Sequence, residues 1–588
     1  MKKIYALLEP AFRKKAIFLL FLMFIGIIVE LLGLGMILPL LSILSTEDMA
    51  ATYPQSAPIL ELLGNPTQKE LVFMALGTLV GIYLFKGLFL VFLAWYQTNF
   101  AYSLSSHLST KLLRGYMAKP YSFHLGKNSA DLIQNLTGEV SHLTGATSNL
   151  FMLITEASAI IGIMILLIAV EPLGAFTVIV LFGLLAVIFH RLTKKRLLAW
   201  GTERQVHDGF RYQYLLQSFG GVKDIMLLGK ARYFTNRFQH HNTASFNLNI
   251  KYATLQHIPR LWFEVVGVIG LVLLMVSLIY QGRPLEAIIP TLAIFVAAAF
   301  RIIPSLNRMV AAVQTIKYAE PSINRLYDEN LGFKDLEPEI VTRPLAFKDE
   351  IELKEVQFSY EGTEGEFLKV DLNIPVGKTI GFIGKSGSGK STSIDIILGL
   401  LKPVSGKVLV DGIDIHDDIR AWQSQIGYVP QTIYFLDDTL RNNIAFGLKP
   451  EQIDEEAVLE AVKMAQIEEF VQSLPEGLDT IIGENGVRIS GGQRQRIGIA
   501  RALYHKPTVL VLDEATSALD NATEDGIMNS IAALHGEKTI LIVAHRLRTV
   551  AMCDQLFLME KGKVVKTGSY AEVMEKDQLH KFREGWKK

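Results

Sequence analysis

The sequence contains only one cysteine, Cys553, among its 588 residues. A single thiol excludes an internal disulfide framework and a metal site built from cysteines. Charged residues are also scarce: they make up 20% of the chain, whereas a soluble globular protein usually carries about 25%. Half of the residues are hydrophobic, which excludes disorder and collagen-like structure and indicates a protein that lies partly in a membrane.

The formal net charge of +0 hides an asymmetry between the two parts of the chain. Residues 1–330 contain 28 Lys and Arg against 18 Asp and Glu, a net charge of +10. The remaining residues contain 30 against 40, a net charge of −10. A basic excess beside apolar segments favours contact with anionic lipid head groups over contact with nucleic acid. The first apolar run lacks a small-residue cleavage site, so we expect no removable signal peptide.

The first half contains continuous apolar runs, each able to supply the roughly 20 residues that cross about 30 Å of hydrocarbon. Only helices and closed barrels satisfy their own backbone in lipid, and these runs lack the alternation of a barrel. The sequence therefore predicts six membrane-spanning helices. The runs are 16–42, 71–96, 150–170, 173–190, 261–280 and 285–310.

Basic residues gather before the first run, between the second and third, and between the fourth and fifth. The positive-inside rule then places both termini in the cytoplasm. The two inner connections are long and too polar for lipid, so we expect the helices to extend beyond the membrane. On the outer side, residues 58–64 predict either a short amphipathic helix on the outer leaflet or an ordinary capped loop.

After about residue 330, short β-branched runs alternate with helical stretches, which is typical of a buried, mostly parallel α/β sheet. The strand-like runs are 379–383, 408–410, 509–512 and 539–543. The expected domains are a transmembrane domain at 1–328, a polar linker at 329–348 and an α/β domain at 349–588. No internal repeat is apparent.

A glycine-rich loop follows the strand predicted at 379–383 and opens a helix, which is the context of a phosphate-binding loop. Backbone N–H groups of such a loop wrap phosphates, and the helix N-terminus adds positive potential. Lys390 is expected to reach the β- and γ-phosphates of ATP, and the Ser391 hydroxyl to bind Mg²⁺. The candidate ATP-binding residues of this segment are Gly384, Lys385, Ser386, Gly387, Ser388, Gly389, Lys390, Ser391 and Thr392.

Four apolar residues end in Asp513-Glu514 further along the chain. A carboxylate at the end of a buried parallel strand lies at the sheet edge where ligands bind. Asp513 is the candidate Mg²⁺ ligand and Glu514 the candidate general base for the attacking water. An acidic pair after a strand can also simply begin a loop, and the phosphate-binding loop is what favours the catalytic interpretation.

With these motifs, residues 350–570 resemble the cassette of the ATP-binding cassette (ABC) superfamily, a P-loop NTPase. Ser490-Gly491-Gly492-Gln493 resembles the family signature, although Ile489 stands where leucine is usual. The resemblance implies further roles for single residues. These are Tyr360 stacking on adenine, Gln431 as a catalytic glutamine that binds Mg²⁺, Asp520 in the loop after the catalytic acid, His545 touching the γ-phosphate, and Glu484 sensing the membrane domain.

One cassette preceded by six spans resembles an exporter-type half-transporter. In that family the signature closes over the nucleotide of the opposite subunit, so the resemblance implies a homodimer with two intact ATP sites. Binding and hydrolysis of ATP would close and open the cassettes and alternate the access of a membrane cavity. Coupling turns are expected near 118–128 and 219–228.

Some stretches of the membrane part are similar to bacterial flippases that move lipid-linked oligosaccharides for protein N-glycosylation. They are residues 30–39, 137–140, 259–264 and 300–308. The implied activity is transfer of a polyprenyl-pyrophosphate oligosaccharide from the cytoplasmic to the outer leaflet of the bacterial inner membrane.

Basic residues inside apolar spans favour an anionic substrate independently, since an unpaired charge costs about 2.5–3.5 kcal/mol at the membrane centre. Arginine forks match phosphate oxygens. The candidate cavity residues are Lys86, Arg260, Arg301 and Arg308. Alternatively, these side chains reach the helix ends or pair with Glu30, Glu156 or Glu264.

Other activities remain open on the sequence alone. The same machine could export lipid A, a hydrophobic drug or a peptide, and internally paired basic residues would favour that alternative. A different class would be an ATP-gated channel or a regulatory subunit. The presence of Glu514 argues against a degenerate ATPase but does not exclude a pore.

Overall fold

The computed structural model describes residues 2–35, 66–170, 172–282, 285–333, 345–360, 367–483, 486, 489–514, 526, 528–529, 531–543 and 547–573. The chain divides into two compact units between Leu336 and Glu337, within the expected linker. The first unit comprises residues 1–119 and 123–336, and the second is built on residues 337–588. The amphipathic segment expected at 58–64 lies outside the described residues.

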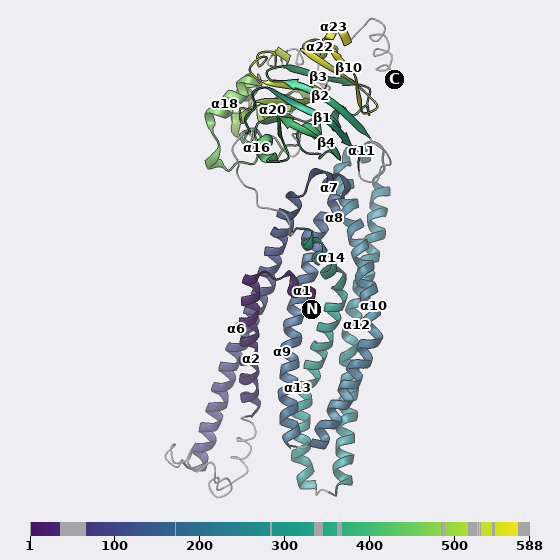
Figure 1. The fold of residues 1–588 in the computed structure, drawn as a ribbon. Coiled ribbons are helices and arrows are strands. Elements are labelled where there is room, and N and C mark those ends of the chain that lie inside the picture. The colour runs from purple at the N-terminus through teal and green to yellow at the C-terminus, as the bar shows by residue number, and fades with distance from the viewer. Residues whose placement is uncertain are drawn as a thin grey trace. The chain divides into compact units, whose positions relative to one another are not determined.

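In its described part the first unit is helical, and six long helices overlap the six predicted apolar runs (Figure 1). They are α2 (Pro10–Gly35), α6 (Gln68–Met117), α9 (Val140–Val170), α10 (Pro172–Gly220), α12 (Ala231–Tyr280) and α13 (Leu285–Tyr318). Shorter helices precede, connect or follow them: α1 (Lys2–Leu7), α7 (Tyr121–Gly126), α8 (Ser129–Gln134), a π-helix η2 (Asn135–Glu139), α11 (Val222–Leu227) and α14 (Glu320–Leu331). Residues 36–42 of the first run lie outside the described residues.

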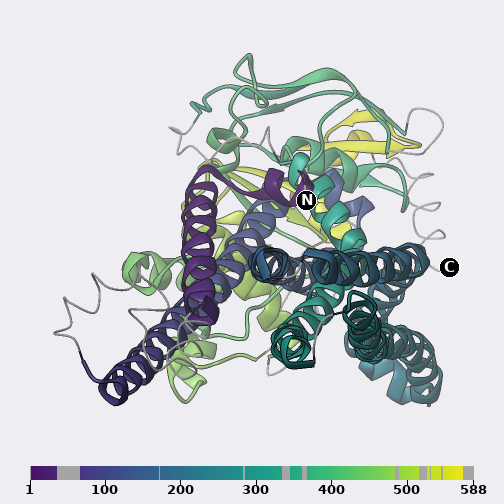
Figure 2. The same ribbon diagram turned by 90° about the horizontal axis from the view of Figure 1, so that it is seen from below.

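Counted on the described residues, four helical stretches are long and apolar enough to cross a membrane. They are 68–117, 129–165, 172–220 and 231–280. Figures 1 and 2 show α2 alongside α6 and α10 alongside α12, and α9 packs against α13. The predicted helical membrane domain is therefore confirmed.

The helices continue well past their apolar runs, as the polar connections predicted. Helix α6 has 50 residues, which at 1.5 Å per residue is about 75 Å and more than twice the hydrocarbon thickness. Buried charges join these extensions: Arg204 of α10 is 1% exposed and lies 3.7 Å from Glu139 and 3.9 Å from Asp208. The Arg204 guanidinium also donates a 3.0 Å hydrogen bond to the hydroxyl of Ser322 on α14.

The second unit contains two sheets. The larger has the order β10-β9-β3-β8-β7-β6 and is parallel except for the β9–β10 pair. Its strands are β3 (Thr379–Gly384), β6 (Ile426–Val429), β7 (Val509–Asp513), β8 (Thr539–Val543), β9 (Gln555–Glu560) and β10 (Lys563–Gly568). Strands β3 and β8 are buried along their whole lengths, which explains their unbroken apolar sequences.

The smaller sheet is antiparallel, with the order β2-β1-β4-β5. Its strands are β1 (Glu350–Phe358), β2 (Leu368–Pro375), β4 (Ser405–Val410) and β5 (Ile413–Asp414). The prediction that 408–410 belongs to the parallel sheet is therefore wrong. Leu353 pairs with Val408 instead, and the alternating burial of β2 shows a sheet with one covered face.

Helices pack around these sheets. They are α15 (Lys390–Ile397), α16 (Ile419–Gln423), α17 (Leu440–Ile444), α18 (Glu455–Met464), α19 (Glu468–Ser473), α20 (Gly491–Tyr504), α22 (Leu547–Ala551) and α23 (Tyr570–Val573). Single-turn 3₁₀ helices lie at Pro450–Gln452 and Gly477–Asp479. Trp422 is fully buried in the core between the sheets and donates its indole N–H to the carbonyl of Ile397 at 2.7 Å.

Candidate functional site

The predicted phosphate-binding loop connects the end of β3 to the start of α15. Gly384 has φ +151° and Gly389 has φ +101°, values that disfavour residues with a side chain. A Cβ atom at Gly384 would lie 2.3 Å from the carbonyl oxygen of Met559, and one at Gly389 would lie 2.7 Å from Leu368. At Gly387 there is no atom within 4 Å of such a Cβ. The loop is thus closely packed at Gly384 and Gly389 and open at Gly387, as a loop that binds phosphate requires.

Lys390, the first residue of α15, folds back over this loop. Its ammonium donates hydrogen bonds to the carbonyls of Gly384 at 2.9 Å and Lys385 at 3.1 Å. Burial lowers the pKa of Lys390, while the charges of Glu514 and Asp513 oppose that shift. Two carboxylates therefore lie close to the ammonium that is predicted to neutralise phosphate charge.

Asp513 ends strand β7, and Glu514 follows with φ +50°. Burial raises the pKa of Asp513, the nearby Glu514 raises it further, and Lys390 lowers it. The left-handed backbone at a residue other than glycine is uncommon and marks a strained position. This position lies directly after the end of β7, at the sheet edge where Glu514 is expected to act.

Gln431 lies in the loop after β6, and its side chain contacts this acidic pair. Its amide Nε2 donates a 2.7 Å hydrogen bond to Oε2 of Glu514. Strands β6 and β7 are parallel neighbours, so their carboxyl ends meet at one edge and bring Gln431 and Glu514 together. Two of the predicted catalytic residues are therefore in direct contact.

The residues at this edge fit a magnesium–triphosphate complex. Ser391 is exposed in the first turn of α15 and presents a hydroxyl, and Asp513 and Gln431 add a carboxylate and an amide oxygen. Mg²⁺ prefers oxygen ligands and is usually held by one or two carboxylates together with substrate phosphates. Among the described residues no group of three or more His, Cys, Asp or Glu side chains could hold a metal alone.

Tyr360 lies beside the start of α15, where the adenine is expected. Its hydroxyl is 2.9 Å from that of Thr392, another predicted ATP contact. The rings of Phe358 and Phe367 pack edge-on against Tyr360, with centroids 5.0 Å and 5.4 Å away. These contacts fix the Tyr360 ring, and the role of the two phenylalanines was not predicted from the sequence.

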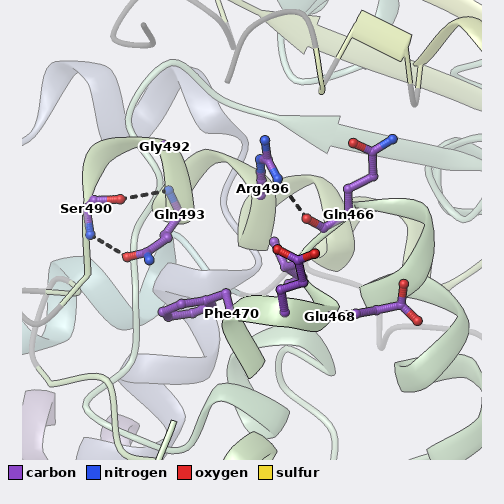
Figure 3. Close-up of a pocket in the computed structure, with 9 residues that line it drawn as sticks. Gln466, Glu468, Phe470, Ser490, Gly492, Gln493 and Arg496 are labelled. Atoms are coloured by element: carbon purple, nitrogen blue, oxygen red, sulfur yellow. Dashed lines mark hydrogen bonds between the residues drawn. The ribbon is translucent and has the colours of Figure 1, made fainter. Parts of the chain in front are cut away.

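The predicted signature forms the N-terminus of α20 and borders a separate pocket (Figure 3). Ser490 and Gln493 form a capping box: the Gln493 backbone N–H donates to the serine hydroxyl at 3.3 Å, and the Ser490 backbone N–H donates to the glutamine side chain at 2.8 Å. Arg496 donates to the carbonyl of Gln466 at 2.7 Å, which ties α20 to the segment before α19. Gly492 and Phe470 also line the pocket.

Some predicted residues cannot be placed. His545, Asp520 and Glu484 lie outside the described residues. The signature residues and the phosphate-binding loop belong to the same unit of one chain, and their pairing across two chains stays a prediction.

Two residues near the site were missed by the sequence analysis. Asp395 lies four residues after Ser391 on α15, and burial together with the charge of Asp513 raises its pKa to about 6. Arg501 donates to the carbonyls of Tyr434 and Asn443, both at 2.8 Å, and so holds the segment that follows Gln431. The i, i+4 spacing from Ser391 was the available signal for Asp395, whereas no local signal predicts Arg501.

The candidate cavity arginines of the membrane unit are paired with carboxylates. Arg308 makes two hydrogen bonds to Glu156 of α9, at 2.6 Å and 3.0 Å, and a third to Ser305 at 3.3 Å. Arg301 pairs with Glu30 of α2.

Arg260 and Lys86 differ from these two. Arg260 pairs at 3.0 Å with Glu264, one turn further along α12, and both side chains are more than half exposed. The Lys86 ammonium lies 5.2 Å from the ring centroid of Tyr83 on its own helix. Each of the three arginines is thus paired with a carboxylate of the same chain. These are the three carboxylates that the sequence analysis named as the alternative partners to an anionic substrate.

Comparisons with known proteins agree with both units. The family model of the ABC transporter transmembrane region matches residues 16–297, and the family model described as ABC transporter matches residues 367–517. An ATP-dependent lipid A-core flippase of Vibrio vulnificus (strain YJ016) is 30% identical over 80% of this chain and 81% of its own length. The same-named protein of Alkalilimnicola ehrlichii is 31% identical over 85% of each chain.

A heterocyst differentiation ATP-binding protein, HepA, of Nostoc sp. (strain PCC 7120) is 29% identical over 83% of this chain and 80% of its own. The fold is similar to a solved structure of a bacterial Atm1-family ABC exporter with ATP bound, with a TM-score of 0.78, 22% identity and 98% of each chain covered. The protein therefore has the ABC exporter fold with an ATPase cassette that drives transport, and it belongs to the ABC transporter family.

Proposed function

We propose that this protein is a homodimeric half-transporter that uses ATP to flip a lipid with a phosphorylated saccharide head group. The direction would be from the cytoplasmic to the outer leaflet of a bacterial inner membrane, with both termini in the cytoplasm. The observation that carries the proposal is the similarity, over about four fifths of each chain, to proteins named ATP-dependent lipid A-core flippases. A lipid of the lipid A-core type is therefore our first candidate substrate.

A polyprenyl-pyrophosphate oligosaccharide is the second candidate. The resemblance of residues 300–308 to oligosaccharide flippases supports it, and so does the accessibility of Arg308, whose side chain is 37% exposed. Glu156 and Ser305 engage Nε and Nη2 of Arg308, so Nη1 has no hydrogen bond to a described residue and can still bind an outside anion. The ion pairs weaken this candidate, because a neutralised arginine attracts a pyrophosphate less strongly.

The geometry of the site supports a proposed role for each residue in ATP hydrolysis. The loop N–H groups and Lys390 bind the phosphates, and Ser391, Asp513 and Gln431 are the candidate ligands of Mg²⁺. That ion would supply charge neutralisation on the phosphate oxygens. Glu514 acts as general base, oriented by its hydrogen bond from Gln431, and His545 is proposed to contact the γ-phosphate.

Dimerisation would complete the site. The pocket at Ser490 and Gly492 presents the N-terminal N–H groups of a 14-residue helix, a favourable environment for phosphate oxygens. Since the phosphate-binding loop already supplies one such environment, we assign the second to the nucleotide of the partner. Closure on ATP would then be transmitted through the turns near 118–128 and 219–228.

The test is ATPase activity of the purified protein in nanodiscs with Mg-ATP. We expect stimulation by lipid A-core, less stimulation by the polyprenyl-pyrophosphate glycan, and at least about a hundredfold lower activity in Glu514→Gln. If a hydrophobic drug stimulated the ATPase activity and neither lipid did, the proposal that the substrate is a lipid would be contradicted. ATP-dependent current across a bilayer would point to a channel instead.

A further inference from the structure

Three basic side chains lie on one face of α10, just beyond its apolar part: Arg191, Lys194 and Lys195, here called the α10 basic face. At 100° per residue these three positions fall within an arc of about 100°. All three side chains are exposed, whereas Thr193 and Leu197, on the opposite side of the helix, are 7% and 1% exposed. The basic face therefore points away from the packed helices of its own chain.

The position of this face along α10 matches the thickness of a bilayer. Helix α10 starts at Pro172, and Arg191 lies 19 residues further on, a rise of about 28 Å. The hydrocarbon core is about 30 Å thick. If Pro172 lies at one edge of the hydrocarbon, the basic face emerges in the head-group layer at the other edge.

The side chains of the α10 basic face differ in their pairing from the arginines inside the spans. Within the described part of the chain, Arg191, Lys194 and Lys195 make no hydrogen bond or ion pair through their side chains, whereas Arg301 and Arg308 are each paired with a carboxylate. Their three positive charges are therefore available to an outside anion.

The neighbouring side chains are apolar. Leu192 is 69% exposed and Leu198 is 39% exposed, and both lie beside the basic face on the helix surface. Basic groups flanked by exposed leucines suit a surface where phosphates border acyl chains.

We propose that the α10 basic face is a binding site for anionic phospholipid head groups of the surrounding bilayer. Arg191 forms two parallel hydrogen bonds to phosphate oxygens, Lys194 and Lys195 add point charges, and Leu192 contacts the acyl region. This site is separate from the transported lipid and does not depend on which substrate the protein flips.

The test is native mass spectrometry of the full-length protein titrated with phosphatidylglycerol or phosphatidylcholine. The variant is Arg191→Gln/Lys194→Gln/Lys195→Gln. The control, Lys354→Gln/Lys402→Gln/Lys449→Gln, removes the same charge from exposed positions of the cassette. Each basic residue near an anionic surface contributes about fivefold in affinity. We therefore expect at least a tenfold weaker phosphatidylglycerol affinity in the α10 variant only, with phosphatidylcholine binding unchanged.

Equal phosphatidylglycerol affinity in both triple variants would overturn the proposal. Loss of the dimer in the α10 variant would overturn it too, and would assign the face to a second copy of this chain. In a parallel titration with lipid A, weaker lipid A binding together with unchanged phosphatidylglycerol binding in the α10 variant would assign the face to the substrate route and not to the bilayer. Retained thermal stability and basal ATPase activity in the α10 variant show that it folds, so that its lipid affinity can be interpreted.

Discussion

At the scale of single residues, arginines that lie in apolar helices are paired with carboxylates. Arg308 lies in an apolar helix, and its pair with Glu156 joins α13 to α9 across 152 positions of sequence. The Glu156 side chain is 13% exposed, so loss of the arginine would leave a largely buried carboxylate without its partner. The pair therefore acts as a structural contact whether or not it also meets substrate.

Arg308→Gln should lower the free energy of unfolding of the membrane unit by about 2 kcal/mol, less than for a fully buried pair because Arg308 is partly exposed. The charge-swapped double variant Glu156→Arg/Arg308→Glu should recover most of that loss. The measurement is thermal unfolding in detergent. Arg260→Gln, which breaks an exposed i, i+4 pair, is the control and should cost less than about 0.5 kcal/mol. A swap that recovers nothing would show that the pair is not a structural contact.

We expect Asp395 to make the stability of the cassette depend on pH. Its pKa of about 6 lies above the ordinary value of 3.8, so between these values the folded protein binds more protons than the unfolded chain. Stability therefore falls as the pH rises through this window. Asp395→Asn should stabilise the nucleotide-free cassette by about 1 kcal/mol at pH 7.5, a figure reduced for partial exposure, and hardly at all at pH 4.5.

This prediction is checked by unfolding both proteins in denaturant at the two pH values. Asp371→Asn, at an exposed position of β2, is the matched control. An equal stability change at both pH values would mean that burial of the Asp395 carboxylate is not the cause.

At the scale of elements, close helix packing depends on glycine at selected positions. Gly201 of α10 lies against the chain at the end of α13: a Cβ there would come 2.2 Å from the carbonyl oxygen of Tyr318 and 3.4 Å from Pro321. Gly183, on the same helix, has no atom within 4 Å of such a Cβ. The two glycines thus differ in packing within one helix.

Gly201→Ala should destabilise the membrane unit by about 1–3 kcal/mol, because the backbone carbonyl cannot move aside cheaply. Gly183→Ala should be neutral or stabilising by up to about 1 kcal/mol through helix propensity. Thermal unfolding of both variants in the same detergent compares them. A destabilised Gly183→Ala together with a wild-type-like Gly201→Ala would contradict the packing.

The elements themselves were largely predictable, because the signals were local. The apolar runs gave the six helices, and the strand–glycine loop–helix order gave the phosphate-binding loop. The sheet that contains 408–410 was not predictable, since its pairing with β1 depends on residues far away in the chain. The same holds for Arg301 and Arg308: the sequence supplied the candidate carboxylates, but only the packing of α13 against α2 and α9 selects one for each arginine.

At the scale of the whole molecule, transport requires that ATP hydrolysis in the cassette be coupled to lipid movement in the membrane unit. The cassette brings Lys390, Asp513, Glu514 and Gln431 to one sheet edge. The membrane unit supplies helices that are much longer than the hydrocarbon layer is thick. Removing the general base should lower the rate of hydrolysis at least about a hundredfold. If hydrolysis drives transport, the flipping rate must fall with it.

The most direct measurement is the movement of fluorescent lipid A-core between leaflets of proteoliposomes with Mg-ATP. We predict ATP-dependent flipping by the natural protein and none by Glu514→Gln. Two results would contradict the coupling of hydrolysis to lipid transport. One is flipping at the same rate in Glu514→Gln, and the other is no flipping by the natural protein in a preparation whose ATPase activity this lipid stimulates.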